Sequence, residues 1–167
     1  MPNHPLDRGH ENSGVKLGAF SKDYKLAEIK TKCKEAKCTL NDAVTAAISV
    51  SLKEYFLSRG DEKTSQILMG IAYNVRSKPK NSTEFYFGNE VSMMPFSVPL
   101  FSNFAQGLSY FHRTLSTMKN SGSASGMFAL SKLILLLPYS VAQQVIYFLC
   151  GRISVVVTNV FGPTQPL

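Results

Sequence analysis

Histidine is the side chain best suited to acid–base chemistry near neutral pH, and the sequence contains three histidines. His4 and His10 lie in a polar segment that has neither helical nor strand periodicity. His112 stands between Phe111 and Arg113 in a segment with helical periodicity. None of the three has the neighbours of a known nucleophile or metal motif. We therefore predict a structural role for each, and an acid–base or ligand role is the alternative.

The carboxylates that could orient a histidine are unevenly distributed. All 11 acidic residues and 14 of the 18 basic residues lie within residues 1–90, whereas residues 91–167 contain four basic residues and no carboxylate. The second half therefore has no carboxylate of its own for a general base, a metal ligand or the orientation of a histidine. The net charge of +7 predicts a basic face but does not identify its partner.

The three cysteines are Cys33, Cys38 and Cys150. A structural zinc site needs four nitrogen or sulfur ligands, and the cysteine spacing does not supply them, so we predict no metal. A disulfide between Cys33 and Cys38 would require a break in the helix between them. Reduced, buried thiols in an intracellular protein are therefore the better interpretation. The first 11 residues contain no apolar run typical of a signal peptide.

Several motifs that would identify a chemistry are absent. The sequence has no G-x-S-x-G, G-x-x-x-x-G-K-[ST], G-x-G-x-x-G or H-E-x-x-H pattern, so it does not support a serine hydrolase, a phosphate-loop protein, a dinucleotide-binding protein or a zinc protease. The lysine-rich segment near residue 30 has no interleaved aromatic side chains, and nucleic acid is therefore not a predicted partner. The composition, 44% hydrophobic and 17% charged, suits a globular domain.

Apolar periodicity predicts the elements that must position these residues. Thr39 and Asp42 form a capping-box pattern at the start of the clearest helix, and Pro95 and Pro99 favour an edge position for their strand. The predicted strands are 15–20, 67–75, 91–100 and 153–157, and the predicted helices are 22–36, 39–60 and 104–118, the last followed by a flexible linker over 120–126. This order predicts an α/β fold with a mixed sheet packed with helices.

The segment 127–150 is almost wholly apolar, and Pro138 is expected to divide it into two helices. Within it, Leu133–Cys150 is 18 residues long, near the minimum for crossing a bilayer of about 30 Å. The internal proline and two glutamines favour a packed or surface-lying helical hairpin. A spanning helix is the alternative.

Three segments resemble motifs of one family in the order that the family has them. The run TLNDAVTAAISVSLKEYFLSRGD over 39–61 is similar to the T-x-N-D-V-V-L-A helix of the wax ester synthase/diacylglycerol O-acyltransferase family of bacteria and plants. FGNEVSMMPFSVPL over 87–100 is similar to its L-G-N-x-x-S strand. TNVFGPTQPL over 158–167 is similar to its S-N-V-P-G-P-x-x-P-L turn. The resemblance covers the chain from about residue 15 onward.

The resemblance implies one lobe of a coenzyme A-dependent acyltransferase fold of the chloramphenicol acetyltransferase type, in which two α/β lobes enclose a tunnel. Residues 1–14 would be a flexible segment, and 15–167 the C-terminal lobe, truncated at its C-terminal end. The family's catalytic H-H-x-x-x-D-G motif belongs to the other lobe and does not occur here. We therefore predict no catalytic residue in this chain and no activity without that lobe.

The positions that match family motifs are the predicted tunnel-supporting residues. They are Asn41, Asp42, Gly88, Asn89, Asn159, Gly162 and Pro163. A structural role explains them as well, because an Asp at a helix start accepts backbone N–H bonds and Gly-Asn or Gly-Pro pairs form turns. Two positions depart from the pattern: Phe161 replaces a proline of the last turn and Thr45 replaces an apolar residue of the helix.

The function implied is esterification of a long-chain alcohol or diacylglycerol with acyl-CoA, that is, synthesis of wax esters or triacylglycerol. Acyl-CoA would be a substrate and no cofactor is predicted. The predicted partners are the N-terminal acyltransferase lobe and a membrane surface, of the endoplasmic reticulum or plasma membrane in a eukaryote. Two alternatives stay open. One is a non-catalytic lipid-binding or membrane-associated module, and the other is an incomplete gene product with no function of its own.

Overall fold

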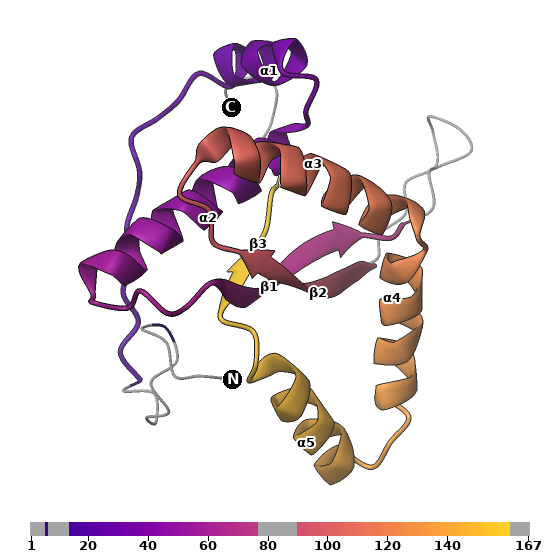
Figure 1. Cartoon of the computed structure of the whole chain (residues 1–167). Coiled ribbons are helices and arrows are strands. Elements are labelled where there is room, and N and C mark those ends of the chain that lie inside the picture. Colours follow the sequence, from indigo (N-terminus) through magenta and orange to yellow (C-terminus); the bar gives the residue numbers. More distant parts are fainter. Residues whose placement is uncertain (1–5, 7–13, 77–89, 161–167) are drawn as a thin grey trace, which may run out of the picture. The chain divides into compact units, whose positions relative to one another are not determined.

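The structure is a computed structural model, which describes residue 6 and residues 14–76 and 90–160. The element order is α1–α2–β1–β2–α3–α4–α5–β3 (Figure 1). These elements form an α/β fold with a mixed sheet, as predicted from the sequence. The predicted segment 1–14 lies outside the described residues except for Leu6 and Gly14.

The described residues fall into two compact units. The first lies within Met1–Gln66 and Pro99–Ser116, and the second lies within Ile67–Val98 and Thr117–Leu167. The first unit contains α1 (Leu26–Glu35), α2 (Leu40–Ser58) and most of α3 (Phe104–Asn120). The second contains β1 (Gln66–Asn74) from its second residue onward, most of β2 (Val91–Pro99), α4 (Ser123–Ile134), α5 (Tyr139–Cys150) and β3 (Val155–Val157).

The core of the first unit lies between α2 and α3. Phe56 of α2 and Phe111 of α3 are fully buried. Gly107 is buried where α3 approaches α2 closely, and a methyl group added to it would lie 3.6 Å from Cβ of Ala46. The Ser49 hydroxyl, also fully buried, donates to the carbonyl of Pro99 (2.7 Å) and accepts from the Phe101 amide (3.0 Å). This hydroxyl therefore ties α2 to the segment that leads into α3.

The three strands are arranged in the order β2-β1-β3. β3 is parallel to β1, with Met69 opposite Val155 and Ile71 opposite Val157. β2 runs antiparallel to β1, because the Val75 amide donates to Glu90 at one end of the pair and the Leu100 amide donates to Ser65 at the other. The predicted edge position of β2 is confirmed, and its Pro95 is exposed at that edge.

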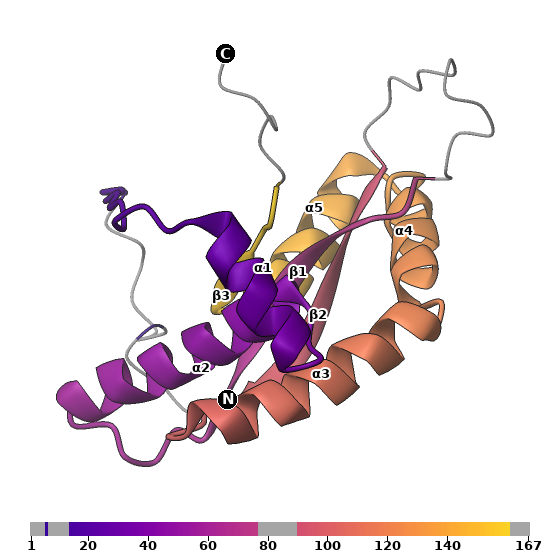
Figure 2. The ribbon, with the colours of Figure 1, turned by 90° about the horizontal axis from the view of Figure 1, so that it is seen from above.

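The second unit also contains the two apolar helices. α4 ends at Ile134 and α5 begins at Tyr139, directly after Pro138, so the predicted division of the apolar segment is confirmed (Figure 2). In the described parts of the chain, no helix combines the length and the apolar character needed to cross a membrane.

Two sequence-based predictions of local structure were wrong. Residues 15–20 form neither a strand nor a helix, and the side chains of Val15, Leu17 and Phe20 are exposed. The predicted linker over 120–126 is mostly helical, because α4 begins at Ser123 and only a short turn with positive φ at Gly122 separates it from α3. The prediction from serine and glycine content made this connection too long, because a single left-handed glycine is sufficient for the turn.

Candidate functional site

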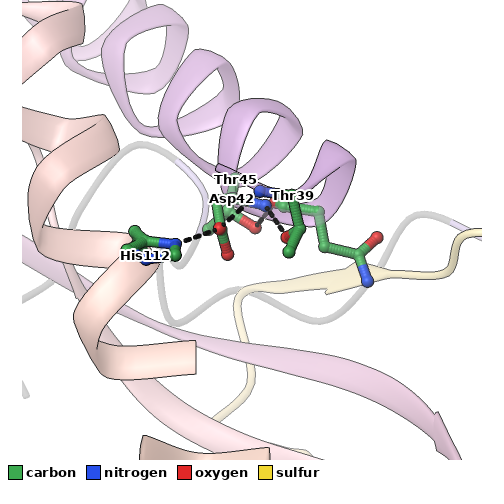
Figure 3. A network of polar contacts seen from close by, with 5 residues as sticks. Thr39, Asp42, Thr45 and His112 are labelled. Atoms are coloured by element: carbon green, nitrogen blue, oxygen red, sulfur yellow. Dashed lines mark hydrogen bonds and ion pairs between the residues drawn. The ribbon is translucent and has the colours of Figure 1, made fainter. Parts of the chain in front are cut away.

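The N-terminus of α2 carries the best-defined polar site among the described residues. Thr39 precedes the helix in an extended conformation, and its backbone amide donates to Oδ2 of Asp42 over 2.8 Å. In return, the Asp42 amide donates to Oγ1 of Thr39 over 3.2 Å (Figure 3). This is the capping box predicted from the sequence. It satisfies two backbone donors and holds a carboxylate at the positive end of the helix.

The same carboxylate oxygen also contacts His112 of α3. Nδ1 of His112 lies 2.8 Å from Oδ2 of Asp42, although the two residues are 70 positions apart (Figure 3). The Asp42 side chain is 3% exposed, whereas that of His112 is 51% exposed. The aspartate is thus fixed inside the first unit, and the imidazole lies at its surface.

The geometry fixes the orientation and tautomer of the imidazole. An ionised carboxylate only accepts hydrogen bonds, so Nδ1 of His112 carries the hydrogen and donates it to Asp42. In neutral His112 the other ring nitrogen, Nε2, then has a lone pair, and it has no partner among the described residues. A histidine held in this way by a carboxylate is able to accept a proton from a hydroxyl group placed at Nε2.

Sequence reasoning missed this pair. It correctly found no carboxylate in the second half of the chain, but Asp42 of the first half orients His112. The capping pattern explained Asp42 completely, and nothing in the residues around His112 indicated a partner. The pairing arises from the packing of α3 against α2, which local periodicity does not reveal.

The other predicted site residues are not part of this pair. Asn41 is exposed in the first turn of α2, where its carbonyl accepts the Thr45 hydroxyl over 2.8 Å. Asn159 is exposed after β3. Gly88, Asn89, Gly162 and Pro163 lie outside the described residues. The structure therefore brings one predicted residue, Asp42, together with a histidine that was not predicted to have a functional role.

Ser92 is a second position that sequence reasoning did not single out. It occupies the serine position of the segment that resembles L-G-N-x-x-S, and it belongs to the buried face of β2 with Met94, Phe96 and Val98. Its Oγ is buried and has no hydrogen-bond partner among the residues that the structure describes. A buried hydroxyl of this kind costs about 1–3 kcal/mol, so such groups are uncommon unless a ligand or a partner satisfies them.

We expect Ser92→Ala to raise the free energy of unfolding by about 1 kcal/mol, because the substitution removes an unsatisfied hydroxyl from a buried position. Urea denaturation monitored by circular dichroism measures this change. Ser97→Ala on the exposed face of the same strand is the matched control and should change stability by less than about 0.5 kcal/mol. Marked destabilisation by Ser92→Ala would mean that its hydroxyl makes a bond in solution.

Metal binding is not supported in the described parts of the chain. No three histidine, cysteine or acidic side chains there lie close enough to hold a metal ion. All three cysteines are free, with Cys33 buried, Cys38 partly buried and Cys150 exposed.

Comparison with known proteins gives one match. Residues 87–167 match the family model described as the WS/DGAT C-terminal domain, which confirms the resemblance to the wax ester synthase/diacylglycerol O-acyltransferase family over these residues. No curated protein matches the chain. No solved structure matches it either, so the chloramphenicol acetyltransferase-like arrangement stays a prediction.

Proposed function

We propose that this chain, which carries the WS/DGAT C-terminal domain over residues 87–167, is the C-terminal part of an O-acyltransferase. The reaction would join the acyl group of acyl-CoA to the hydroxyl of a long-chain alcohol or a diacylglycerol. The family match carries this proposal, and the motif over 39–61, which lies outside the matched residues, supports it.

Acyl transfer to a hydroxyl needs a base that removes the hydroxyl proton as the thioester carbonyl is attacked. In the proposed enzyme this base is a histidine of the lobe that carries H-H-x-x-x-D-G. This lobe is the N-terminal acyltransferase lobe that the family resemblance implies. Asp42 is then a positioning residue, because it holds the start of α2 and the imidazole of His112 in one place. The other motif residues, Asn41, Gly88, Asn89, Asn159, Gly162 and Pro163, are proposed to support the tunnel.

The full-length transcript around this reading frame tests the proposal. An H-H-x-x-x-D-G segment upstream and in frame is the result that we expect. A stop codon directly upstream of Met1, together with the absence of any separate gene for such a lobe, would argue against an acyltransferase and would favour a non-catalytic role.

The second candidate function is lipid binding at a membrane surface without catalysis. The observation that favours it is the apolar surface of α4, α5 and their connection, here called the α4–α5 surface. Leu135, Leu136, Tyr139, Tyr147 and Phe148 of this surface are 61–81% exposed. The cations of Lys132 and Arg152 lie over the rings of Phe128 and Phe148, at 4.5 and 4.4 Å. Exposed apolar side chains bordered by basic residues suit the interface of an intracellular membrane.

We expect the protein to float with liposomes that contain anionic lipid and to remain bound when the salt concentration is raised. The double variant Leu136→Ser and Tyr139→Ser should weaken the binding at least about tenfold, because burial of each of these side chains contributes roughly 1.5–3 kcal/mol. Leu57→Ser and Tyr24→Ser, also at exposed positions but outside the α4–α5 surface, form the matched control.

The two variants and the salt series separate the possible outcomes of this experiment. Binding that salt abolishes would assign the interaction to the lysine residues and not to the α4–α5 surface. Protein that stays in the unbound fraction at low salt would contradict membrane contact by this surface altogether.

A further inference from the structure

Helix α1 ends in a turn, and a cysteine lies at each end of this turn. Lys37 has a positive φ of 52°, and the Cys38 amide donates to the carbonyl of Cys33 over 2.9 Å. The Lys37 amide donates to Lys34 over 3.1 Å. A left-handed residue enclosed by such nested bonds is a Schellman motif, which brings the two residues joined by the outer bond close together and is frequently accompanied by a contact between their side chains. Here those side chains are the thiols of Cys33 and Cys38.

The thiol environment agrees with this contact. Cys33 is buried and Cys38 is partly buried, and neither is in a disulfide. Burial raises the pKa of the Cys38 thiol, and so do a side-chain hydrogen bond with Cys33, the charge of Cys33 and the charge of Asp42. These effects on the pKa of Cys38 agree with two thiols that lie close together and near the Asp42 carboxylate.

We propose that Cys33 and Cys38 form a reversible dithiol–disulfide site that reacts with small-molecule disulfides. A disulfide between these residues requires a break in the helix between them. The break exists, because α1 ends at Glu35 and the chain turns at Lys37 before it reaches Cys38. In an intracellular protein such a pair is reduced at rest and is oxidised transiently.

The reaction balances as two successive thiol–disulfide exchanges. Cys38 is the more accessible thiol, and its ionised fraction, which the raised pKa keeps small, attacks one sulfur of glutathione disulfide. This attack forms a mixed disulfide and releases one glutathione thiolate. The Cys33 thiolate then attacks the Cys38 sulfur, which forms the Cys33–Cys38 bond and expels the second glutathione. The two cysteines lose two protons and two electrons, and one glutathione disulfide becomes two glutathione molecules.

Oxidation would act on the polar site through the chain connection. Cys38 directly precedes Thr39, whose amide and hydroxyl hold Asp42 in the capping box. A Cys33–Cys38 bond would therefore fix the end of α1 to the residue next to this box. The site is independent of the acyltransferase proposal, since it lies in α1 and its C-terminal turn and not in residues 87–167.

The experiment uses the full chain with Cys150→Ser, so that only the paired thiols remain. The protein is equilibrated with mixtures of reduced and oxidised glutathione, quenched with acid, alkylated with N-ethylmaleimide and weighed by mass spectrometry. We expect one oxidised species that is lighter than the dithiol form by two hydrogen atoms and takes up no maleimide. Peptide mapping should place the bond between Cys33 and Cys38.

Single-cysteine variants provide the controls. Cys38→Ser and Cys33→Ala, each shown to be folded by circular dichroism, should accept at most one glutathione and form no internal bond. The proposal is overturned if the two-cysteine protein accumulates glutathione adducts without the internal disulfide, or if both thiols remain reactive toward maleimide at every glutathione ratio. If a single-cysteine variant does not fold, peptide mapping of the unaltered chain still decides whether the Cys33–Cys38 disulfide forms.

Discussion

Replacement of Phe111 by alanine is expected to lower the free energy of unfolding by about 3–5 kcal/mol, the largest change that we predict for a single substitution. Phe111 is fully buried, and its ring packs edge-on against the rings of Phe101 and Tyr110, with centroids 5.9 and 5.2 Å away. Removal of the ring leaves a cavity and breaks both contacts. Urea denaturation monitored by circular dichroism measures the loss.

Phe104→Ala is the matched control for this substitution. Phe104 lies in the first turn of the same helix and is 45% exposed, so its truncation should cost less than about 1 kcal/mol. Equal effects of the two substitutions would contradict the placement of the core between α2 and α3. Since His112 follows Phe111 directly, the same core also determines where the imidazole lies.

Replacement of Asp42 by alanine is expected to destabilise the protein by about 2–3 kcal/mol. The carboxylate accepts the Thr39 amide and contacts His112 from a site where it is 3% exposed. Loss of a helix cap costs about 0.5–2 kcal/mol, and hydrogen bonds to a charged group contribute more than neutral ones. Asp23→Ala, at an exposed aspartate before α1, is the control and should change stability by less than about 0.5 kcal/mol.

Nitrogen NMR of the histidine rings separates the two roles of Asp42. In the unaltered protein, neutral His112 should have its hydrogen on Nδ1, and in the Asp42→Ala variant this preference should disappear. Asp42→Asn should retain part of the cap, because an amide oxygen still accepts the Thr39 amide. A His112 ring that keeps its tautomer without Asp42 would show that the carboxylate does not orient it.

The helices and strands with strong local signals were predicted well from the sequence. Thr39 and Asp42 marked the start of α2, and Pro95 and Pro99 indicated an edge strand, because a proline cannot donate to a neighbouring strand. The expected strand over 15–20 failed, because alternation alone does not supply a partner strand. The exposed Leu17 and Phe20 show that these side chains find no core among the described residues.

The candidate site was predicted less completely than the fold. A motif resemblance identified Asp42, but the partner His112 is brought to it only when α3 packs against α2. The unsatisfied hydroxyl of Ser92 likewise depends on what surrounds β2 in the folded chain. Cys33 and Cys38 were interpreted as buried thiols that a disulfide could not join without a break in the helix between them. The chain reversal at Lys37 needs a positive φ, and a lysine in the sequence does not indicate one. Tertiary contacts and unusual backbone angles are the information that periodicity lacks.

A reconstitution assay tests whether this chain is one part of a two-lobe acyltransferase, as proposed above. The chain is co-expressed with a first lobe of the same family that carries H-H-x-x-x-D-G, and co-purification establishes that the two form a complex. Ester formation from radiolabelled acyl-CoA is then measured with a long-chain alcohol and with diacylglycerol. A first lobe in which the second histidine of the motif is replaced by alanine is the control.

We predict that the complex forms ester at least about 100-fold faster than the chain alone or the complex with the altered histidine, since a positioned base contributes about 10²–10⁴-fold to such a step. Ester formation by the chain alone would contradict the assignment of the base to the other lobe. A folded, co-purified complex that forms no ester with either acceptor would contradict the acyltransferase function itself.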